Sequence, residues 1–167
     1  MTARATREPK SPKSCHERAL GLLAVRPRSR RELELRLLRA GFDEQEVAEV
    51  LGRLQGVGLI DDEAFARAVA EHAFGTRLSG SIAVRQALGV KGVSGETVDT
   101  VVAELGGGEE ERAVALARSR VGRLGGLPPE KAFGRLVGLL ARRGYPSSVA
   151  RRAARLALQV DEGEIEA

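Results

Sequence analysis

The chain has few of the residues on which several classes of protein depend. Aromatic residues make up only 3% of its 167 residues, and tryptophan is absent. Sheets favour β-branched and aromatic residues, so a core built from Leu, Val and Ala suits packed helices better. The shortage of aromatic residues also argues against a base-stacking platform for single-stranded nucleic acid.

Cysteines and long apolar runs are scarce as well. The single cysteine, Cys15, excludes an internal disulfide framework and agrees with a reducing compartment. No apolar run approaches the roughly 18 residues of a membrane span, and the first residues lack the apolar stretch of a signal peptide. We therefore expect a cytoplasmic protein with no membrane partner.

Charge is distributed unevenly along the chain. Residues 109–159 hold eleven basic and four acidic residues, although the net charge of the whole chain is only +4. Residues 160–167 carry four acidic residues and no basic one. Clustered arginines neutralise phosphates and release counterions, so the pattern indicates a nucleic acid or an acidic partner. The alternative is a solvated, arginine-rich surface.

An internal repeat organises the chain. Three stretches align on a glycine that follows an apolar helix, with glycine spacings of 51 and 52 residues: LELRLLRAGF with Gly41, VRQALGVKGV with Gly92, and LVGLLARRGY with Gly144. Large apolar residues lie four and eight positions before each glycine, which is one face of a helix. Each glycine is predicted to follow a helix end, where a left-handed conformation favours a residue without a Cβ.

Apolar spacing predicts a second helix after each glycine and another helix before each pair. Ser29 and Glu32 predict a capping box at the second helix of the first group. The predicted fold is all-α, an elongated tandem array of three-helix repeats with about nine helices. The predicted boundaries are a disordered basic segment at 1–15, repeats at 16–58, 59–108 and 109–159, and an acidic tail at 160–167.

The stretch GLIDDEAFA at residues 58–66 contains two adjacent aspartates, which raises the question of a metal or catalytic site. If Asp61 is the N-cap of a helix that begins at Asp62, its carboxylate accepts hydrogen bonds from exposed N–H groups. Ile60 and Phe65 then occupy the two positions of a hydrophobic staple. We favour this structural interpretation of Asp61, Ile60 and Phe65 over a metal or catalytic pair.

No other pattern supports enzyme chemistry. His16 and His72 are far apart and have no partner at metal-ligand spacing, which argues against zinc. Cys15 has no evident base and falls in the segment predicted to be structureless. No stretch matches a phosphate-binding loop. We expect no catalytic residue, no metal, no cofactor and no enzymatic activity.

Two groups of arginines are the candidate binding residues. Arg28, Arg30 and Arg31 flank a helix start, where they oppose the helix dipole, so a binding role is favoured over a stabilising one. The second group brackets the last glycine turn and the helix after it, and is predicted to form a dense patch able to grip phosphates or acidic side chains: Arg142, Arg143, Arg151, Arg152 and Arg155.

Four segments together resemble the RecX family, regulators of the bacterial recombinase RecA. They are RSRRELELRLLRAGF (28–42), GLIDDEAFARAVAEHA (58–73), LGVKGVSGETV (88–98) and KAFGRLVGLLARRGYPSSVARR (131–152). The resemblance covers about residues 16 to 158. Gly89 in the middle copy and Tyr145 in place of the more usual Phe are departures from the family pattern.

The resemblance implies tandem three-helix repeats and no catalytic residues. It also implies binding to RecA, chiefly to its nucleoprotein filament on single-stranded DNA, by a monomer that lies in the filament groove. The implied effect is inhibition or modulation of ATP hydrolysis, strand exchange and co-protease activity, in DNA repair, recombination and the SOS response. The alternatives are a helical module that contacts DNA or RNA directly, and a metal-dependent enzyme built on Asp61 and Asp62.

Overall fold

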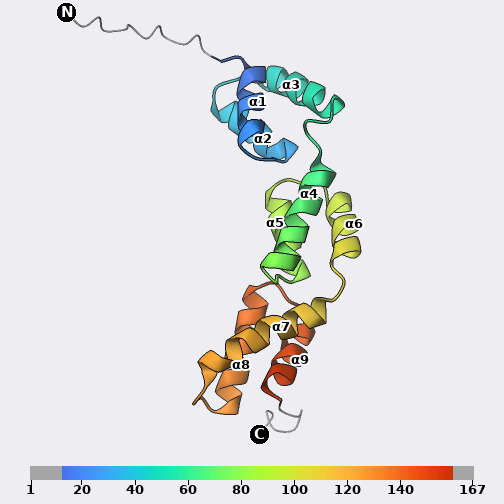
Figure 1. The fold of residues 1–167 in the computed structure, drawn as a ribbon. Helices are drawn as coiled ribbons and strands as arrows, with labels where there is room; N and C mark the ends of the chain where they lie inside the picture. The colour runs from blue at the N-terminus through green and yellow to red at the C-terminus, as the bar shows by residue number, and fades with distance from the viewer. Residues whose placement is uncertain (1–12, 160–167) are drawn as a thin grey trace, which may run out of the picture. The chain divides into compact units, whose positions relative to one another are not determined.

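The computed structural model describes residues 13–159, and the described part of the chain contains nine α-helices and no strand (Figure 1). The all-α prediction is confirmed. The helices are α1 (Cys15–Val25), α2 (Arg30–Arg39), α3 (Glu44–Gly56), α4 (Asp62–Glu71), α5 (Ser81–Val90), α6 (Gly95–Leu105), α7 (Glu109–Val121), α8 (Pro129–Arg142) and α9 (Ser147–Leu158). A π-helical turn, η1 (His72–Thr76), follows α4, and a 3-10 turn, η2 (Gly122–Leu124), follows α7.

The chain divides into two compact units, one ending at Ile60 and the other beginning at Asp61. The first unit contains the first triplet, α1–α3, and the second unit contains the second triplet, α4–α6, and the third, α7–α9. Each triplet has its own buried cluster, centred on Leu33 and Leu37, on Val84 and Leu88, and on Leu136 and Leu140. These pairs are the apolar positions that define the sequence repeat. Each copy of the repeat therefore supplies the centre of its own buried cluster.

The glycine that ends the second helix of each triplet has the predicted left-handed backbone. Gly41, Gly92 and Gly144 have φ angles of 93°, 72° and 82°. In every copy the next residue donates its N–H to a carbonyl in the last helical turn, as Phe42 does to Leu37 at 3.3 Å and Tyr145 to Leu140 at 3.1 Å. This is the hydrogen-bond pattern of a Schellman motif, and it turns the chain toward the next helix.

Every helix of the first unit begins with a side-chain cap from its own sequence. Ser14 and Glu17 form a capping box on α1. The Ser29 hydroxyl accepts a hydrogen bond from the Glu32 N–H at 3.1 Å, and the Asp43 carboxylate accepts one from the Gln45 N–H at 2.8 Å. Such caps satisfy N–H groups that the helix itself leaves without a partner.

The start of α4 has the hydrogen bond expected of the Asp61 cap. The Asp61 carboxylate accepts a hydrogen bond from the Ala64 N–H at 2.9 Å. Ile60 and Phe65 are both buried, but Ile60 belongs to the cluster of the first triplet and Phe65 to that of the second. Each side chain is thus buried by the core of its own triplet, and the staple stays a prediction.

Within the second unit, helix α5 is capped by the third triplet instead of by its own sequence. Its N-cap residue is Gly80, which has no side chain to offer. The Gly80 N–H donates to the Arg143 carbonyl at 2.8 Å, and the Ile82 N–H donates to the Gly144 carbonyl at 3.1 Å. The Ser81 N–H donates to the Glu109 carboxylate at 2.7 Å. The turn after α8 therefore completes a helix of the second triplet.

Side chains reinforce this junction between the second and third triplets. The Tyr145 hydroxyl donates to the Leu78 carbonyl at 2.7 Å, and the Arg143 guanidinium donates to the Arg77 carbonyl at 2.8 Å. Gly80 and Gly144 lie so close that a Cβ on Gly80 would overlap the Gly144 carbonyl. Close backbone contact explains why both positions are glycine.

One part of the predicted domain layout needs correction. The predicted disordered segment at 1–15 includes Cys15, but Cys15 is the first residue of α1 and is fully buried. The cause is the Ser14 cap, which starts the helix one residue before the predicted repeat. The remainder of the segment predicted to be disordered, apart from residues 13–14, and the acidic tail at 160–167 lie outside the described residues.

Candidate basic groove of the third triplet

The structure assigns Arg28 a structural role. Its side chain is buried, its Nε donates to the Leu22 carbonyl at 3.1 Å, and its guanidinium forms an ion pair with Glu32. A buried guanidinium with these partners is not available to a ligand. The prediction that Arg28 is a binding residue is therefore wrong, because Glu32 in the first turn of α2 compensates its charge.

The other two arginines of this group lie on the same helix. The Arg30 Nε donates to the Gln55 side chain at 3.3 Å, which ties the start of α2 to α3. Arg31 is exposed and pairs with Glu34 at 2.6 Å. Neighbouring carboxylates therefore compensate much of the positive charge at this helix start, and Arg31 keeps an exposed guanidinium.

The five arginines of the predicted C-terminal patch do not form one cluster. Arg143 is engaged with the Arg77 carbonyl, and Arg152 pairs with Glu110 at 3.1 Å. The Arg155 guanidinium lies 6.0 Å from the centre of the Phe133 ring. Arg151 is exposed on α9, and Arg142 lines a groove on another part of the triplet. Helical geometry separates residues that the sequence places side by side.

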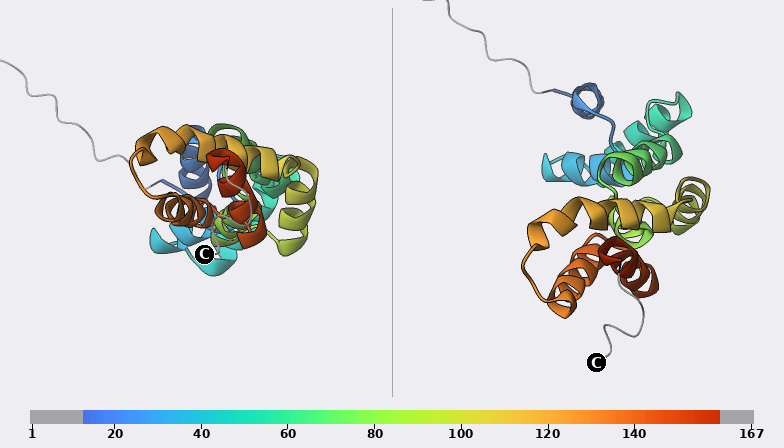
Figure 2. Two further views of the ribbon diagram at one scale, coloured as in Figure 1. Left: turned by 90° about the horizontal axis from the view of Figure 1, so that it is seen from below. Right: turned by 60° about the horizontal axis from the view of Figure 1, so that its bottom comes forward.

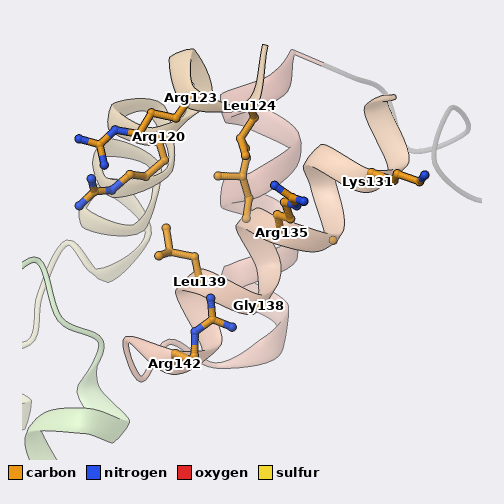
Figure 3. A pocket seen from close by; sticks show the side chains of 10 residues that line it. Arg120, Arg123, Leu124, Lys131, Arg135, Gly138, Leu139 and Arg142 are labelled. Atoms are coloured by element: carbon orange, nitrogen blue, oxygen red, sulfur yellow. The ribbon is translucent and has the colours of Figure 1, made fainter. Parts of the chain in front are cut away.

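The groove that contains Arg142 is formed by the end of α7, η2 and one face of α8, and has a volume of about 720 Å³ (Figure 3). Helix α7 runs across α8 and α9 in this triplet (Figure 2). Five cationic side chains line the groove: Arg120, Arg123, Lys131, Arg135 and Arg142. The other lining residues are Leu124, Gly134, Leu136, Gly138 and Leu139. No carboxylate of the described residues lines it.

Helical periodicity explains why these cations meet. Lys131, Arg135 and Arg142 are separated by four and seven residues, so they lie along one stripe of α8. Gly134 and Gly138 lie on the same stripe, where the absence of side chains leaves the groove hollow. A search for basic residues at this spacing would have found the α8 part of the groove. The contribution of Arg120 and Arg123 requires the packing of α7 beside α8.

The five cations of the groove have no ion-pair partner among the residues that the structure describes. The Nε of Arg120 is buried and has no hydrogen-bond partner in the described chain. Like charges held in one groove repel each other, so a bound polyanion would relieve an unfavourable interaction. Arginine side chains suit phosphates and carboxylates as ligands.

Residues 13–159 contain no candidate metal centre. No three His, Cys, Asp or Glu residues there form a group that could hold a metal ion. Burial raises the pKa of the Cys15 thiol, with a smaller contribution from Glu46, so the reactive thiolate is disfavoured. None of the helices between residues 13 and 159 has the length and apolar character needed to cross a bilayer.

Comparison with known protein families gives three consecutive matches. Models for the first, second and third three-helix domains of RecX match residues 15–54, 61–102 and 108–154. The three matched ranges coincide with the three triplets of the structure. Together they cover well over half of the chain.

Curated relatives and solved structures agree with these matches. The chain is 41% identical over 150 residues to the "Regulatory protein RecX" of Mycolicibacterium smegmatis, covering 87% of this chain and 78% of the relative. It is 37% identical over 139 residues to that of Amycolatopsis mediterranei, covering 83% and 79%. None of these descriptions names a catalytic activity.

Two crystal structures share the fold. RecX from Lactobacillus salivarius superposes with a TM-score of 0.75 at 20% identity, over 86% of this chain and 95% of the other. A second structure, described as regulatory protein RecX, gives a TM-score of 0.74 at 26% identity, over 83% and 70%. The arrangement of helices described above is therefore one that solved RecX structures have.

Proposed function

Because the chain belongs to the RecX family of regulatory proteins, we propose that it binds the recombinase RecA and its filament on single-stranded DNA. The proposed effect is inhibition or modulation of ATP hydrolysis, strand exchange and co-protease activity. The protein acts as a monomeric binding protein in the cytoplasm, without chemistry of its own. Support comes from the regulatory name shared by its relatives and from the family resemblance of its motifs.

The basic groove is the proposed contact to the filament. The observation that carries this part of the proposal is its five cations, none of which pairs with a carboxylate of residues 13–159. A filament on DNA presents phosphates and acidic protein side chains. Cations that neutralise phosphates release counterions, so the contact contributes affinity that falls as salt rises. Arg142 and Arg151 remain candidates from the predicted patch, because both are exposed and lack an ion pair among the described residues.

The direct test is a DNA-dependent ATPase assay of RecA from the same organism, with this protein titrated in. Inhibition or another change in turnover is expected at substoichiometric to equimolar amounts. An unchanged rate at a several-fold excess would contradict the proposal.

Charge reversal tests the groove itself. Arg142→Glu combined with Arg135→Glu is expected to weaken filament binding at least tenfold while the chain stays folded, since both side chains are exposed. A matched control is Arg39→Glu combined with Arg18→Glu, which changes the net charge equally. Arg39 and Arg142 are each the last residue of a helix. Charge reversal at either position therefore has a similar unfavourable interaction with the helix dipole. Equal loss in both variants would mean that only net charge matters.

A second candidate function is direct nucleic-acid binding without the recombinase, because the same groove suits a phosphodiester backbone. A salt titration of binding to single-stranded DNA in the absence of RecA separates the two. A steep dependence of log affinity on log salt, lost in the Arg135→Glu and Arg142→Glu variant, would favour it.

A further inference from the structure

We propose that the acidic segment at residues 160–167 of this chain occupies the basic groove of the third triplet, as an internal competitor of external polyanions. The inference deepens the function proposed above, on which it rests for the identity of the external ligand. Three observations support it. The segment and the groove are complementary in charge, the segment is long enough to reach the groove, and several other arginines of the triplet already have partners.

The segment and the groove are complementary in charge. The sequence VDEGEIEA holds Asp161, Glu162, Glu164 and Glu166 and no basic residue. Among residues 13–159, the side chains that line the groove include five cations and no carboxylate. Val160 and Ile165 supply apolar side chains, and the groove is lined by the partly exposed Leu124 and Leu139. Both the charge and the apolar surface therefore have a counterpart.

The segment is long enough to reach the groove. It follows α9, whose last residue, Leu158, packs against the same core cluster as Leu124, which lines the groove. A chain of eight residues spans up to about 26 Å when extended. A helical module of some 50 residues has a radius of gyration of roughly 10 Å. Most of the surface of the third triplet is therefore within reach.

Three other arginines of the third triplet are poorer partners for the segment, because each is already engaged. Arg152 already pairs with Glu110, Arg143 is held by the Arg77 carbonyl, and Arg112 bonds to the Gly106 carbonyl at 2.9 Å. The groove concentrates its cations on one surface without such compensation. A short acidic segment gains most where several free charges act together.

The consequence is regulation of the groove by the chain itself. A tethered segment is present at an effective concentration on the order of millimolar, so it competes even when its intrinsic affinity is low. A filament, which offers many anions in series, displaces it, whereas an isolated anion does not. The segment thus raises selectivity for extended polyanions.

Paramagnetic relaxation in the full chain tests the contact. A spin label is placed at Ala167→Cys in a Cys15→Ala background, and amide broadening is measured by NMR. Broadening of the amide signals of residues 131–142 is expected. This broadening should disappear at high salt and in the Arg135→Glu and Arg142→Glu variant. It should persist in the Arg18→Glu and Arg39→Glu control. Absence of broadening in the groove, or broadening confined to α9, would overturn the proposal.

A binding cycle tests the competition, with a fluorescent single-stranded oligo(dT) as the probe and no recombinase present. The neutralised segment carries Asp161→Asn, Glu162→Gln, Glu164→Gln and Glu166→Gln. It should tighten binding roughly tenfold with the native groove, and it should change nothing when Arg135 and Arg142 are reversed. An equal gain in both backgrounds would reveal a general charge effect and overturn the inference.

The two proposals fail separately. The relaxation and oligo(dT) measurements contain no recombinase, so they report on the segment and the groove alone. A segment that occupies the groove in a protein without effect on the RecA ATPase would refute the proposed function and leave the inference standing. If the protein inhibits the RecA ATPase but shows no broadening in the groove, the inference is refuted and the proposed function stands.

Discussion

The first unit and the second unit begin their helices in different ways. In the first unit, α1, α2 and α3 are capped by Ser14, Ser29 and Asp43 from their own sequence. Among the described helices of the second unit, only α4 and α6 have such caps, and the first turn of α5 depends on carbonyls and a carboxylate of the third triplet. The first unit is thus locally specified, whereas the second depends on contacts between segments distant in sequence.

Two natural probes can follow the units separately. Cys15 is the only cysteine and lies in the first unit, and Tyr145 is the only tyrosine and lies in the second. Both are buried, so each becomes accessible when its unit unfolds. Thiol reactivity and tyrosine fluorescence during urea unfolding therefore report the stability of the two units in one sample.

The largest difference is expected between two glycines that have the same role in the repeat. Gly144→Ala should lower the unfolding free energy of the second unit by about 3 kcal/mol, because left-handed strain adds to overlap with the backbone of Ala83. Gly41→Ala should cost the first unit about 1 kcal/mol, because its Cβ would meet nothing within 4 Å. The urea midpoints of the two probes measure both values. Similar costs at the two sites would contradict the interlocked junction.

The next largest effect on stability separates the cost of steric overlap from the cost of a left-handed backbone. Gly80 has an ordinary φ of −82°, yet a Cβ there would overlap the Gly144 carbonyl, so Gly80→Ala should cost roughly 2 kcal/mol. Gly89→Ala, in the middle of α5, should stabilise the same unit by about 0.5 kcal/mol, because the added Cβ meets nothing. The urea midpoint measured by tyrosine fluorescence should therefore fall for Gly80→Ala and rise for Gly89→Ala. If both variants raised the stability of the second unit, the contact between Gly80 and Gly144 would have to accommodate a Cβ without loss of stability.

A smaller effect compares one local cap with one junction hydrogen bond. Ser29→Ala removes the cap of α2 and should cost the first unit about 1 kcal/mol. Tyr145→Phe removes the bond to the Leu78 carbonyl and should cost the second unit about 1 kcal/mol. Hydrogen exchange read by mass spectrometry should place each loss in its own unit. Loss of protection in both units from either variant would show that the units are coupled.

The smallest effect is a dependence on alkaline pH. Burial raises the pKa of Tyr145 above its ordinary 10.0, and burial also raises that of Cys15 above 9.0. The unfolded chain then releases these protons first, so the stabilisation is complete below the ordinary values and is lost as pH rises toward the folded values. The first unit should begin to weaken above pH 9.0 and the second above pH 10.0.

Direct titration checks this last expectation. Near-ultraviolet tyrosinate absorbance follows Tyr145 alone, since the chain has no other tyrosine. The slope of stability with pH should not exceed about 1.4 kcal/mol per pH unit for each group. Cys15→Ala should remove the dependence assigned to that thiol in the first unit only. Titration of Tyr145 at its ordinary value in the folded protein would contradict the buried hydroxyl.

Much of the fold could be read from local patterns. Apolar spacing and the glycines at Gly41, Gly92 and Gly144 predicted the helices and their ends, because both depend on residues within one or two turns. The arginine prediction was less successful. Arg28 is buried against Glu32, and the predicted C-terminal patch is divided between the groove, the junction and α9. Adjacent positions on a helix point in different directions, so closeness in sequence did not give closeness in space.

The sequence by itself determined the three-helix repeat, the left-handed turns and the cap at Asp61, since each is set by the chemistry of neighbouring residues. Only the tertiary structure decided which cations share a surface, why Ile60 and Phe65 are buried in different cores, and how Gly80 and Gly144 join two triplets. Those features depend on distances between segments that lie far apart in the chain, and local propensities do not encode such distances.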